Sequence, residues 1–404
     1  MKAVVFHGIG DIRLENVPEP KLIHATDAIV QITTSAICGT DLHLVRGTLP
    51  GVRKGTVLGH EAVGVVLEVG RDVRNLRPGD RVVVPSTIAC GACAYCRAGY
   101  FAQCDASNPN GRSAGTAFYG GPADSGPFDG LQAERARIPF ANVGLVKLPE
   151  SVDDDDAILL SDIFPTAWFG AKLAEIRRGD TVCVFGCGPV GQLCIASAKL
   201  LGAGRVLAVD RVPDRLEMAS RQGAEVIDFE DEDPVETIRR LTSGIGVDRA
   251  IDAVGVDATH AHHGPAAKKF KKDRQDFEDE LERIAPERNP EGDNWVPGDA
   301  PSQVLDWAVD ALAKAGTLSI VGVYPDTATR FPIGKAMNKN LTLQMGNCNH
   351  RKYVPELLAL IQTQAVRPSR ILTNSVPLEG AIEAYRSFDR REPGYTKVEL
   401  RVAA

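Results

Sequence analysis

Four of the chain's nine cysteines stand within fifteen residues. Cys90, Cys93, Cys96 and Cys104 follow the spacing C-x2-C-x2-C-x7-C. Thiolates two residues apart can fold around one Zn²⁺, and four sulfurs at about 2.3 Å complete a closed tetrahedron. A filled tetrahedron leaves no position for a substrate or a water molecule. The spacing therefore predicts a structural zinc site.

Two other interpretations of this cysteine cluster are weaker. Unrelated free thiols in a loop would rarely be so dense. A zinc ribbon that binds nucleic acid would need basic flanks, whereas the chain has 46 basic and 53 acidic residues and a net charge of −7. We therefore expect no nucleic-acid partner.

A glycine-rich turn predicts a dinucleotide site. The run "TVCVFGCGPVGQLCIASAKLLG" (181–202) places G-x-G-x-x-G directly after an apolar strand and at the start of a helix. The glycines allow a tight turn, a close approach to a pyrophosphate and helix–strand packing, and the helix N-terminus offers N–H groups to the phosphates. The residues expected at the cofactor here are Gly186, Gly188, Pro189, Val190 and Gly191.

The next strand, "RVLAVD", ends on a carboxylate that predicts which dinucleotide is bound. Asp210 lies 19 positions after Gly191, close to the separation of about 20 that is typical of this motif. A carboxylate there accepts both ribose hydroxyls and repels a 2′-phosphate, which favours NAD over NADP. The adjacent Arg211 weakens that preference. The alternative is that Asp210 is only a turn residue at a strand end.

The elements that must position these groups divide the 404 residues into two domains. Residues 1–163 are rich in β-branched runs broken by Gly, Pro and Asp, and 346–404 return to a mixed pattern that ends in "KVELRVAA". Between them, residues 164–345 alternate short apolar strands with amphipathic helices. That alternation predicts an α/β fold with a parallel sheet covered on both faces.

A charged insert at 257–302 interrupts the second domain. We expect one helix near "DRQDFEDELERI" with loops around it. The favoured interpretation is a solvated excursion, and the alternative is a lid or an oligomer contact.

Composition and sequence pattern indicate in which compartment the protein is expected. No stretch reaches about 18 apolar residues, so no membrane-spanning helix is expected. The N-terminus lacks the apolar core and cleavage site of a signal peptide. We therefore expect a cytoplasmic protein with reduced thiols.

Two further groups with metal-binding chemistry lie upstream of the cysteine cluster. Cys38 occurs in "AICGTDLHLVRG", and His60 and Glu61 occur in "VLGHEAVGVV". Alone, Cys38 is typical of a small buried residue and His60 of a core histidine. In this order, "CGTDLH", "GHEAVGVV", the four cysteines and the strand–GxGxxG–helix–Asp run resemble the zinc-dependent medium-chain alcohol dehydrogenases over nearly the whole length.

The resemblance implies a β-rich GroES-like catalytic domain, with a zinc lobe at about 88–106, joined to a Rossmann domain. It also implies a catalytic zinc held by Cys38, His60 and a third ligand from the segment between the domains. In "LLSDIFPTAWFG" that third position is Asp162, where many relatives have cysteine. An aspartate oxygen can bind Zn²⁺ at about 2.0–2.2 Å. The alternative is that Asp162 caps a helix and Glu61 completes the metal shell.

The resemblance also implies the chemistry. Zinc with an open fourth position lowers the pKa of an alcohol or polarises an aldehyde or its hydrate, and NAD accepts the hydride. Thr40 and His43 match the family's proton relay, with the imidazole at the surface. Asp41 would hold the second nitrogen of His60, and Glu61 would approach the zinc during ligand exchange.

Further cofactor contacts are implied for Thr166 under the nicotinamide, for Val321 and Val323 after the strand "TLSI", and for Lys397 on the pyrophosphate. "SDIFPT" and the insert are closest to the glutathione-independent formaldehyde dehydrogenases. Small alcohols or aldehydes are therefore the expected substrates, and a homodimer or homotetramer is the expected assembly. A polyol or sugar dehydrogenase, and a non-catalytic nucleotide-binding scaffold, are the alternatives.

Overall fold

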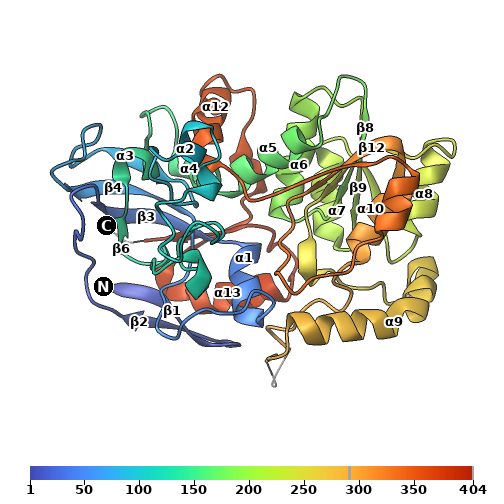
Figure 1. Cartoon of the computed structure of the whole chain (residues 1–404), viewed down its shortest axis with the longest axis horizontal. Coiled ribbons are helices and arrows are strands. Elements are labelled where there is room, and N and C mark those ends of the chain that lie inside the picture. The colour runs from blue at the N-terminus through green and yellow to red at the C-terminus, as the bar shows by residue number, and fades with distance from the viewer. Residues whose placement is uncertain (290–292, 403–404) are drawn as a thin grey trace.

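The computed structural model describes residues 1–289 and 293–402. Positions 290–292 of the predicted insert and 403–404 of the predicted C-terminal segment lie outside the described residues. Two lobes stand side by side with a seam between them (Figure 1), and both chain termini lie at the same lobe. No described helix is both long and apolar enough to cross a membrane.

The first lobe is built on a seven-stranded sheet with the order β14-β15-β3-β4-β5-β7, and β6 pairs with β3. A two-stranded antiparallel sheet of β1 (Lys2–Gly8) and β2 (Asp11–Asn16) lies beside it. The strands of the larger sheet are β3 (Ala28–Ile37), β4 (Ala62–Val69), β5 (Arg81–Val84), β6 (Arg135–Ile138), β7 (Val146–Lys147), β14 (Asn374–Pro377) and β15 (Val398–Arg401). Strand β15 pairs antiparallel with β3, so the C-terminal segment completes the N-terminal lobe.

Helices cover the first lobe and lead to the second. They are α1 (Gly39–Arg46), α2 (Ala94–Arg97), α3 (Ala141–Gly144), α4 (Asp154–Ser161), α5 (Ile163–Leu173), α12 (His350–Gln362) and α13 (Ala381–Asp389). Helices α4 and α5 meet at Asp162 and carry the chain from one lobe to the other (Figure 1). Their buried side chains form one continuous core that reaches into the second lobe.

The second lobe confirms the predicted α/β class. Its six strands lie in the order β10-β9-β8-β11-β12-β13, and every pair is parallel. They are β8 (Thr181–Phe185), β9 (Arg205–Asp210), β10 (Glu225–Asp228), β11 (Val247–Asp252), β12 (Leu312–Ile320) and β13 (Thr342–Met345). The order reverses between β8 and β11, which is where doubly wound sheets bind nucleotides.

Helices pack on both faces of this sheet, as its unbroken apolar strands require. Helix α5 joins α6 (Pro189–Leu200) and α7 (Pro213–Arg221) on one face, whereas α8 (Pro234–Leu241), α10 (Gln303–Ala311) and α11 (Ile333–Asn338) cover the other. The apolar residues buried on the two faces fall into separate clusters.

The insert differs from the expected solvated excursion. Helix α9 (Gly264–Ile284) is longer than predicted, and it lies along the lower edge of the molecule (Figure 1). The chain that follows it returns to the seam, where Trp295 is 6% exposed and packs against Tyr385 of α13 with ring centroids 6.4 Å apart. An aromatic side chain buried against the first lobe shows that the solvated interpretation is wrong for this part of the insert.

Candidate active site

Three donor groups from separate elements meet at the seam. Cys38 precedes α1, His60 precedes β4, and Asp162 stands between α4 and α5. The Oδ2 atom of Asp162 lies 3.5 Å from Cys38 Sγ and 3.3 Å from His60 Nε2. A tetrahedral zinc with bonds of about 2.0–2.3 Å would separate its donors by about 3.3–3.8 Å. These thiolate, imidazole and carboxylate donors therefore fit one zinc ion.

Asp162 does not act as a helix cap. It occupies the N-cap position of α5, but its side chain makes no capping hydrogen bond. Burial alone would raise the pKa of Asp162, but hydrogen bonds from His350 and His60 hold that pKa well below its usual value. The carboxylate is therefore ionised and available as a ligand.

The other two donors depend on their surroundings. Burial raises the pKa of the Cys38 thiol to about 11, so only a nearby cation can hold it as a thiolate. Behind His60, the Nδ1 atom lies 3.4 Å from Oδ1 of Asp41. The other oxygen of Asp41 accepts the backbone N–H of Cys38 at 2.9 Å. Asp41 thus lies where a partner that orients the His60 ring is expected.

Glu61 and Lys397 form a buried ion pair behind these donors. The Nζ atom of Lys397 lies 2.8 Å from Oε1 and 2.7 Å from Oε2 of Glu61, and it also donates to the Ile37 carbonyl. Lys397 borders the cleft, but its side chain has no exposed surface. A buried carboxylate needs such a cation as its counter-ion, and nothing in the sequence indicated this pairing. The expected role of Lys397 on the pyrophosphate stays a prediction. Glu61 still offers an oxygen within 4.8 Å of the three donors.

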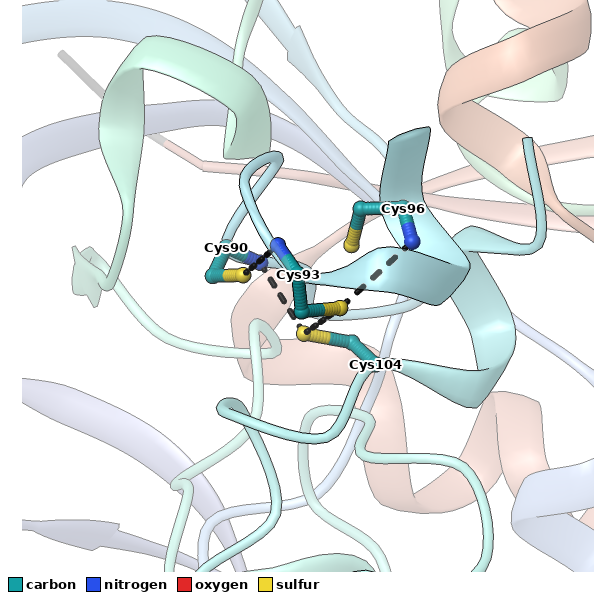
Figure 2. Close-up of side chains that lie close together, drawn as sticks. All are labelled: Cys90, Cys93, Cys96 and Cys104. Carbon is teal, nitrogen blue, oxygen red and sulfur yellow. Dashed lines mark hydrogen bonds between the residues drawn. The ribbon is translucent and has the colours of Figure 1, made fainter. Parts of the chain in front are cut away.

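The four-cysteine lobe forms a second, separate group (Figure 2). The sulfurs of Cys90, Cys93, Cys96 and Cys104 lie within 4.8 Å of one another and point toward a common centre. Backbone N–H groups donate to these sulfurs, for example from Cys90 to Cys104 at 3.2 Å. Four thiols from one short segment can close a tetrahedron around Zn²⁺ and leave no vacant ligand position.

A cavity of about 640 Å³ opens in the seam between the lobes. Its lining includes the three donors, the glycine-rich loop, and the predicted residues Thr40, Thr166, Val321 and Val323. A cleft that joins a metal site to the switch point of a parallel sheet can hold a dinucleotide and a small substrate together.

The glycines of the loop have distinct roles. Gly186 has φ 88°, which a side chain would strain, and a Cβ on Gly191 would lie 1.8 Å from the Gly186 carbonyl oxygen. A Cβ on Gly188 would meet only the guanidinium of Arg215, at 3.7 Å. Gly188 therefore leaves an open space at the N-terminus of α6, where Pro189 is the first helical residue.

Asp210 lies at the cleft, as predicted, and Arg211 lines the same cleft. The oxygens of Asp210 accept backbone N–H groups from Cys187 at 2.6 Å, from Arg211 at 2.7 Å and from Val212 at 2.9 Å. A carboxylate has about four acceptor sites, so room remains for a ribose hydroxyl. The guanidinium of Arg211 contacts Glu230 at 3.2 Å and Thr259 at 3.1 Å.

His43 is not at the surface, which corrects that part of the predicted relay. Its side chain is 8% exposed, and its Nδ1 atom lies 2.7 Å from Oδ2 of Asp257. The same oxygen is 2.9 Å from Nη1 of Arg46, and Arg46 also pairs with Asp389 at 2.7 Å. Asp257 begins the insert, and therefore the insert, α1 and α13 share one buried ionic cluster.

Several residues that line the cleft were not predicted. His350, at the start of α12, lies against Asp162, and Asp257 holds His43. Arg215 and Arg391 line the cleft, and neither forms an ion pair within the described residues. Burial, together with Arg46, Arg215 and Arg211, lowers the pKa of Arg391 to about 9. Of these four residues, only Arg215 could have been found from the sequence, because it lies five residues after Asp210. His350, Asp257 and Arg391 lie far from every motif.

Comparison with known proteins agrees with this geometry. Two family models match, "Alcohol dehydrogenase GroES-like domain" over residues 24–150 and "Zinc-binding dehydrogenase" over 189–262. A zinc-type alcohol dehydrogenase-like protein of Bacillus subtilis is 36% identical over 99% of this chain and 100% of its own. A glutathione-independent formaldehyde dehydrogenase of Pseudomonas aeruginosa is 35% identical over 97% and 96%.

A solved structure extends this agreement to the whole fold. The alcohol dehydrogenase TADH from Thermus sp. ATN1 is 36% identical, covers 100% of both chains and has a TM-score of 0.80. Full-length identity of this order and both matching family models confirm the resemblance that the sequence motifs indicated. The chain belongs to the family of zinc-dependent medium-chain alcohol dehydrogenases.

Proposed function

We propose that the chain is an NAD-dependent dehydrogenase of small alcohols or aldehyde hydrates, with formaldehyde-type substrates favoured. The observation that carries this proposal is the placement of the three metal donors Cys38, His60 and Asp162 in the same cleft as the glycine-rich loop, from which Gly186, Gly188, Pro189 and Val190 line it. When bound, zinc would supply a Lewis acid and NAD a hydride acceptor. We further propose that residues 1–163 and 346–404 form the catalytic domain and 164–345 the cofactor domain.

The chain's own residues bind and orient the reactants and move the protons. Thr40 and His43 lie one turn apart on α1 and both line the cleft. The hydroxyl of Thr40 can take a proton from the substrate side. Because Asp257 holds Nδ1 of His43, that nitrogen carries the proton and Nε2 is left to exchange protons in the cleft.

The preference for NAD rests on the charges at the end of β9. Asp210 places a carboxylate at the cleft, where it favours ribose hydroxyls over a 2′-phosphate. Arg215 and Arg391 add positive charge at the same end of the cleft. We propose that they attract the cofactor phosphates, whereas Lys397 pairs with Glu61.

The substrate class rests on the metal end of the cleft and on similarity. Ser86 lies 3.2 Å from Asp162 Oδ1, so a small side chain stands beside the metal ligands. The Pseudomonas relative of similar length is named a glutathione-independent formaldehyde dehydrogenase. The test is NADH formation from formaldehyde without glutathione, compared with ethanol, benzyl alcohol and sorbitol. Faster turnover of sorbitol would favour a polyol dehydrogenase instead, and no turnover of any substrate would overturn the proposal.

An exposed sheet edge supports a homo-oligomer. Strand β13 is the last strand of the six-stranded sheet, and Met345 on it is 62% exposed. Ile333 and Met337 of α11 are 65% and 71% exposed. Unpaired edges with apolar side chains are suited to pairing with a second copy. Light scattering that gives the mass of a dimer or tetramer would support this assembly, and the mass of a monomer would exclude it.

The thiol ligands support the expected compartment. Cysteines that bind zinc must remain reduced, which favours the cytoplasm over an oxidising compartment.

A further inference from the structure

His350 joins the metal site from a distant part of the chain. It is the first residue of α12, 188 positions after Asp162, and it is 3% exposed. Its Nε2 atom lies 2.7 Å from Oδ1 of Asp162. This is the shortest polar contact that the Asp162 side chain makes among the described residues.

The two oxygens of Asp162 face different neighbours. Oδ2 faces the other metal donors, at 3.5 Å from Cys38 Sγ and 3.3 Å from His60 Nε2. Oδ1 faces His350 and, each at 3.2 Å, the hydroxyls of Ser86 and Thr166. Only Oδ2 is therefore directed to the centre of the donor set.

The imidazole is itself held at both nitrogens. Nδ1 of His350 lies 3.2 Å from Oγ1 of Thr87, which follows β5, and Nε2 is within 3.3 Å of Ser86 Oγ. Helix α12 packs on α4 and α5, the two helices that meet at Asp162. The ring therefore has one orientation in the core, and its Nε2–H can donate to Asp162.

We infer that His350 is a positioning residue that makes Asp162 a one-oxygen ligand of the catalytic zinc. The inference rests on the proposed ligand role of Asp162. A thiolate has a single donor atom, but a carboxylate can rotate or bind through either or both oxygens. A hydrogen bond that occupies Oδ1 removes this freedom, because it leaves Oδ2 alone facing Cys38 and His60.

The test measures metal binding without substrate. Zinc affinity of the catalytic site is determined by competition with a chromophoric chelator, and the ligand geometry by the visible spectrum of the cobalt-substituted protein. We expect His350→Leu to weaken binding at this site by about 10- to 100-fold and to change the cobalt spectrum. His350→Gln, which keeps an N–H donor, should retain most of the affinity. Unchanged affinity and spectrum in His350→Leu would overturn the inference.

The substitution of His350 in an Asp162→Cys variant distinguishes a positioning role of His350 from a purely structural one. In Asp162→Cys, the ligand has no second oxygen to restrain, so adding His350→Leu should leave zinc affinity unchanged within about twofold. Equal losses in both backgrounds would show that His350 only supports the fold. Retention of zinc in the four-cysteine lobe reports that each variant is folded, and His350→Gln provides the answer if His350→Leu does not fold.

The outcome is distinguishable from a failure of the proposed function. If Asp162→Ala keeps both zinc ions, the ligand assignment fails. If Asp162→Ala loses one zinc ion while His350→Leu changes nothing, only the positioning role fails.

Discussion

The ammonium of Lys397 lies 2.7 Å from a carboxylate oxygen of Glu61, and neither side chain has any exposed surface. Burial alone would lower the pKa of Lys397, but Glu61 raises it above its usual value. The pair lies directly behind Cys38, because the same ammonium donates to the Ile37 carbonyl. This buried ion pair therefore supports the metal site from beneath Cys38.

Removing the cation of this pair should destabilise the protein more than it affects cofactor binding. Lys397→Met leaves Glu61 buried and unpaired, so we expect the free energy of unfolding in urea to fall by about 3–5 kcal/mol. The double variant Lys397→Met/Glu61→Gln should recover part of that loss. Unchanged stability with weakened NAD binding would instead support the expected role of Lys397 on the pyrophosphate.

The cluster around Asp257 should give stability a defined pH dependence. Burial alone would raise the pKa of Asp257, but Arg46 and His43 hold it well below its usual value. A carboxylate with a depressed pKa stabilises the fold above its unfolded pKa of about 3.9, and this contribution is lost as the pH falls toward the folded pKa.

We therefore expect Asp257→Asn to lower the free energy of unfolding by about 3–5 kcal/mol at pH 6 and by less at pH 3. Urea unfolding at both values, with EDTA in all samples so that metal release adds no pH dependence, measures the difference. Asp299→Asn is a matched control, because its pair with His260 is 45% exposed at the carboxylate and should contribute only about 0–1 kcal/mol. An equal loss of unfolding free energy at pH 6 and at pH 3 would contradict the prediction.

Two glycines in the cofactor loop should respond differently to alanine. In Gly191→Ala, the new methyl group would overlap the Gly186 carbonyl oxygen, so thermal unfolding should shift to a much lower temperature. In Gly188→Ala, the methyl group meets only Arg215 at 3.7 Å, so the melting temperature should remain near that of the wild type. NAD affinity of Gly188→Ala should nevertheless fall at least about tenfold, because the methyl group occupies the space above the helix terminus. Normal affinity would place the pyrophosphate elsewhere.

The two metal sites should be separable by mutation. Asp162→Ala should lower zinc content by mass spectrometry from two ions to one per chain and abolish turnover, while NAD binding remains largely intact. Cys93→Ser should also remove one ion, but its main effect should be a lower melting temperature, because zinc bound to the four cysteines would hold the lobe together. Full activity in Asp162→Ala would exclude its role as a ligand.

Cofactor choice should depend on Asp210 and not on Asp228, its neighbour on strand β10. Asp210→Ala should weaken NAD binding and reduce discrimination against NADP, because the carboxylate that repels a 2′-phosphate is gone. Asp228 is paired with Asp210 across β9 and β10 and does not line the cleft, so Asp228→Ala controls for loss of a strand-end carboxylate. A wild-type NAD-to-NADP ratio in Asp210→Ala would show that the ribose contact lies elsewhere.

The sequence alone predicted the groups whose spacing is short. The cysteines from 90 to 104, the glycine loop and Asp210 each lie within one local pattern, and the structure places them as those patterns require. The gathering of Cys38, His60 and Asp162 could be expected only from the family resemblance, because the three residues lie on separate elements.

The sequence could not predict which residues far apart in the chain contact one another. Lys397 was expected at the cofactor, yet burial beside Glu61 decides its partner, and burial cannot be read from a single charged residue near a chain end. His350 and Asp257 contact Asp162 and His43 from 188 and 214 positions away, and no periodicity in the chain connects them. The burial of Trp295 could not be predicted either, because its charged neighbours give the insert the composition of an exposed segment.

The junction of the insert with α1 has a consequence for protein engineering. Asp257 and Trp295, from opposite ends of the insert, both contact the first lobe, through Arg46 and Tyr385. Selection for new substrates that randomises only cleft residues would change Arg46 and Asp257, which line the cleft, and would leave Trp295 and Tyr385 constant. Libraries that vary the rest of the insert while retaining Asp257 and Trp295 would keep both of its contacts with the first lobe.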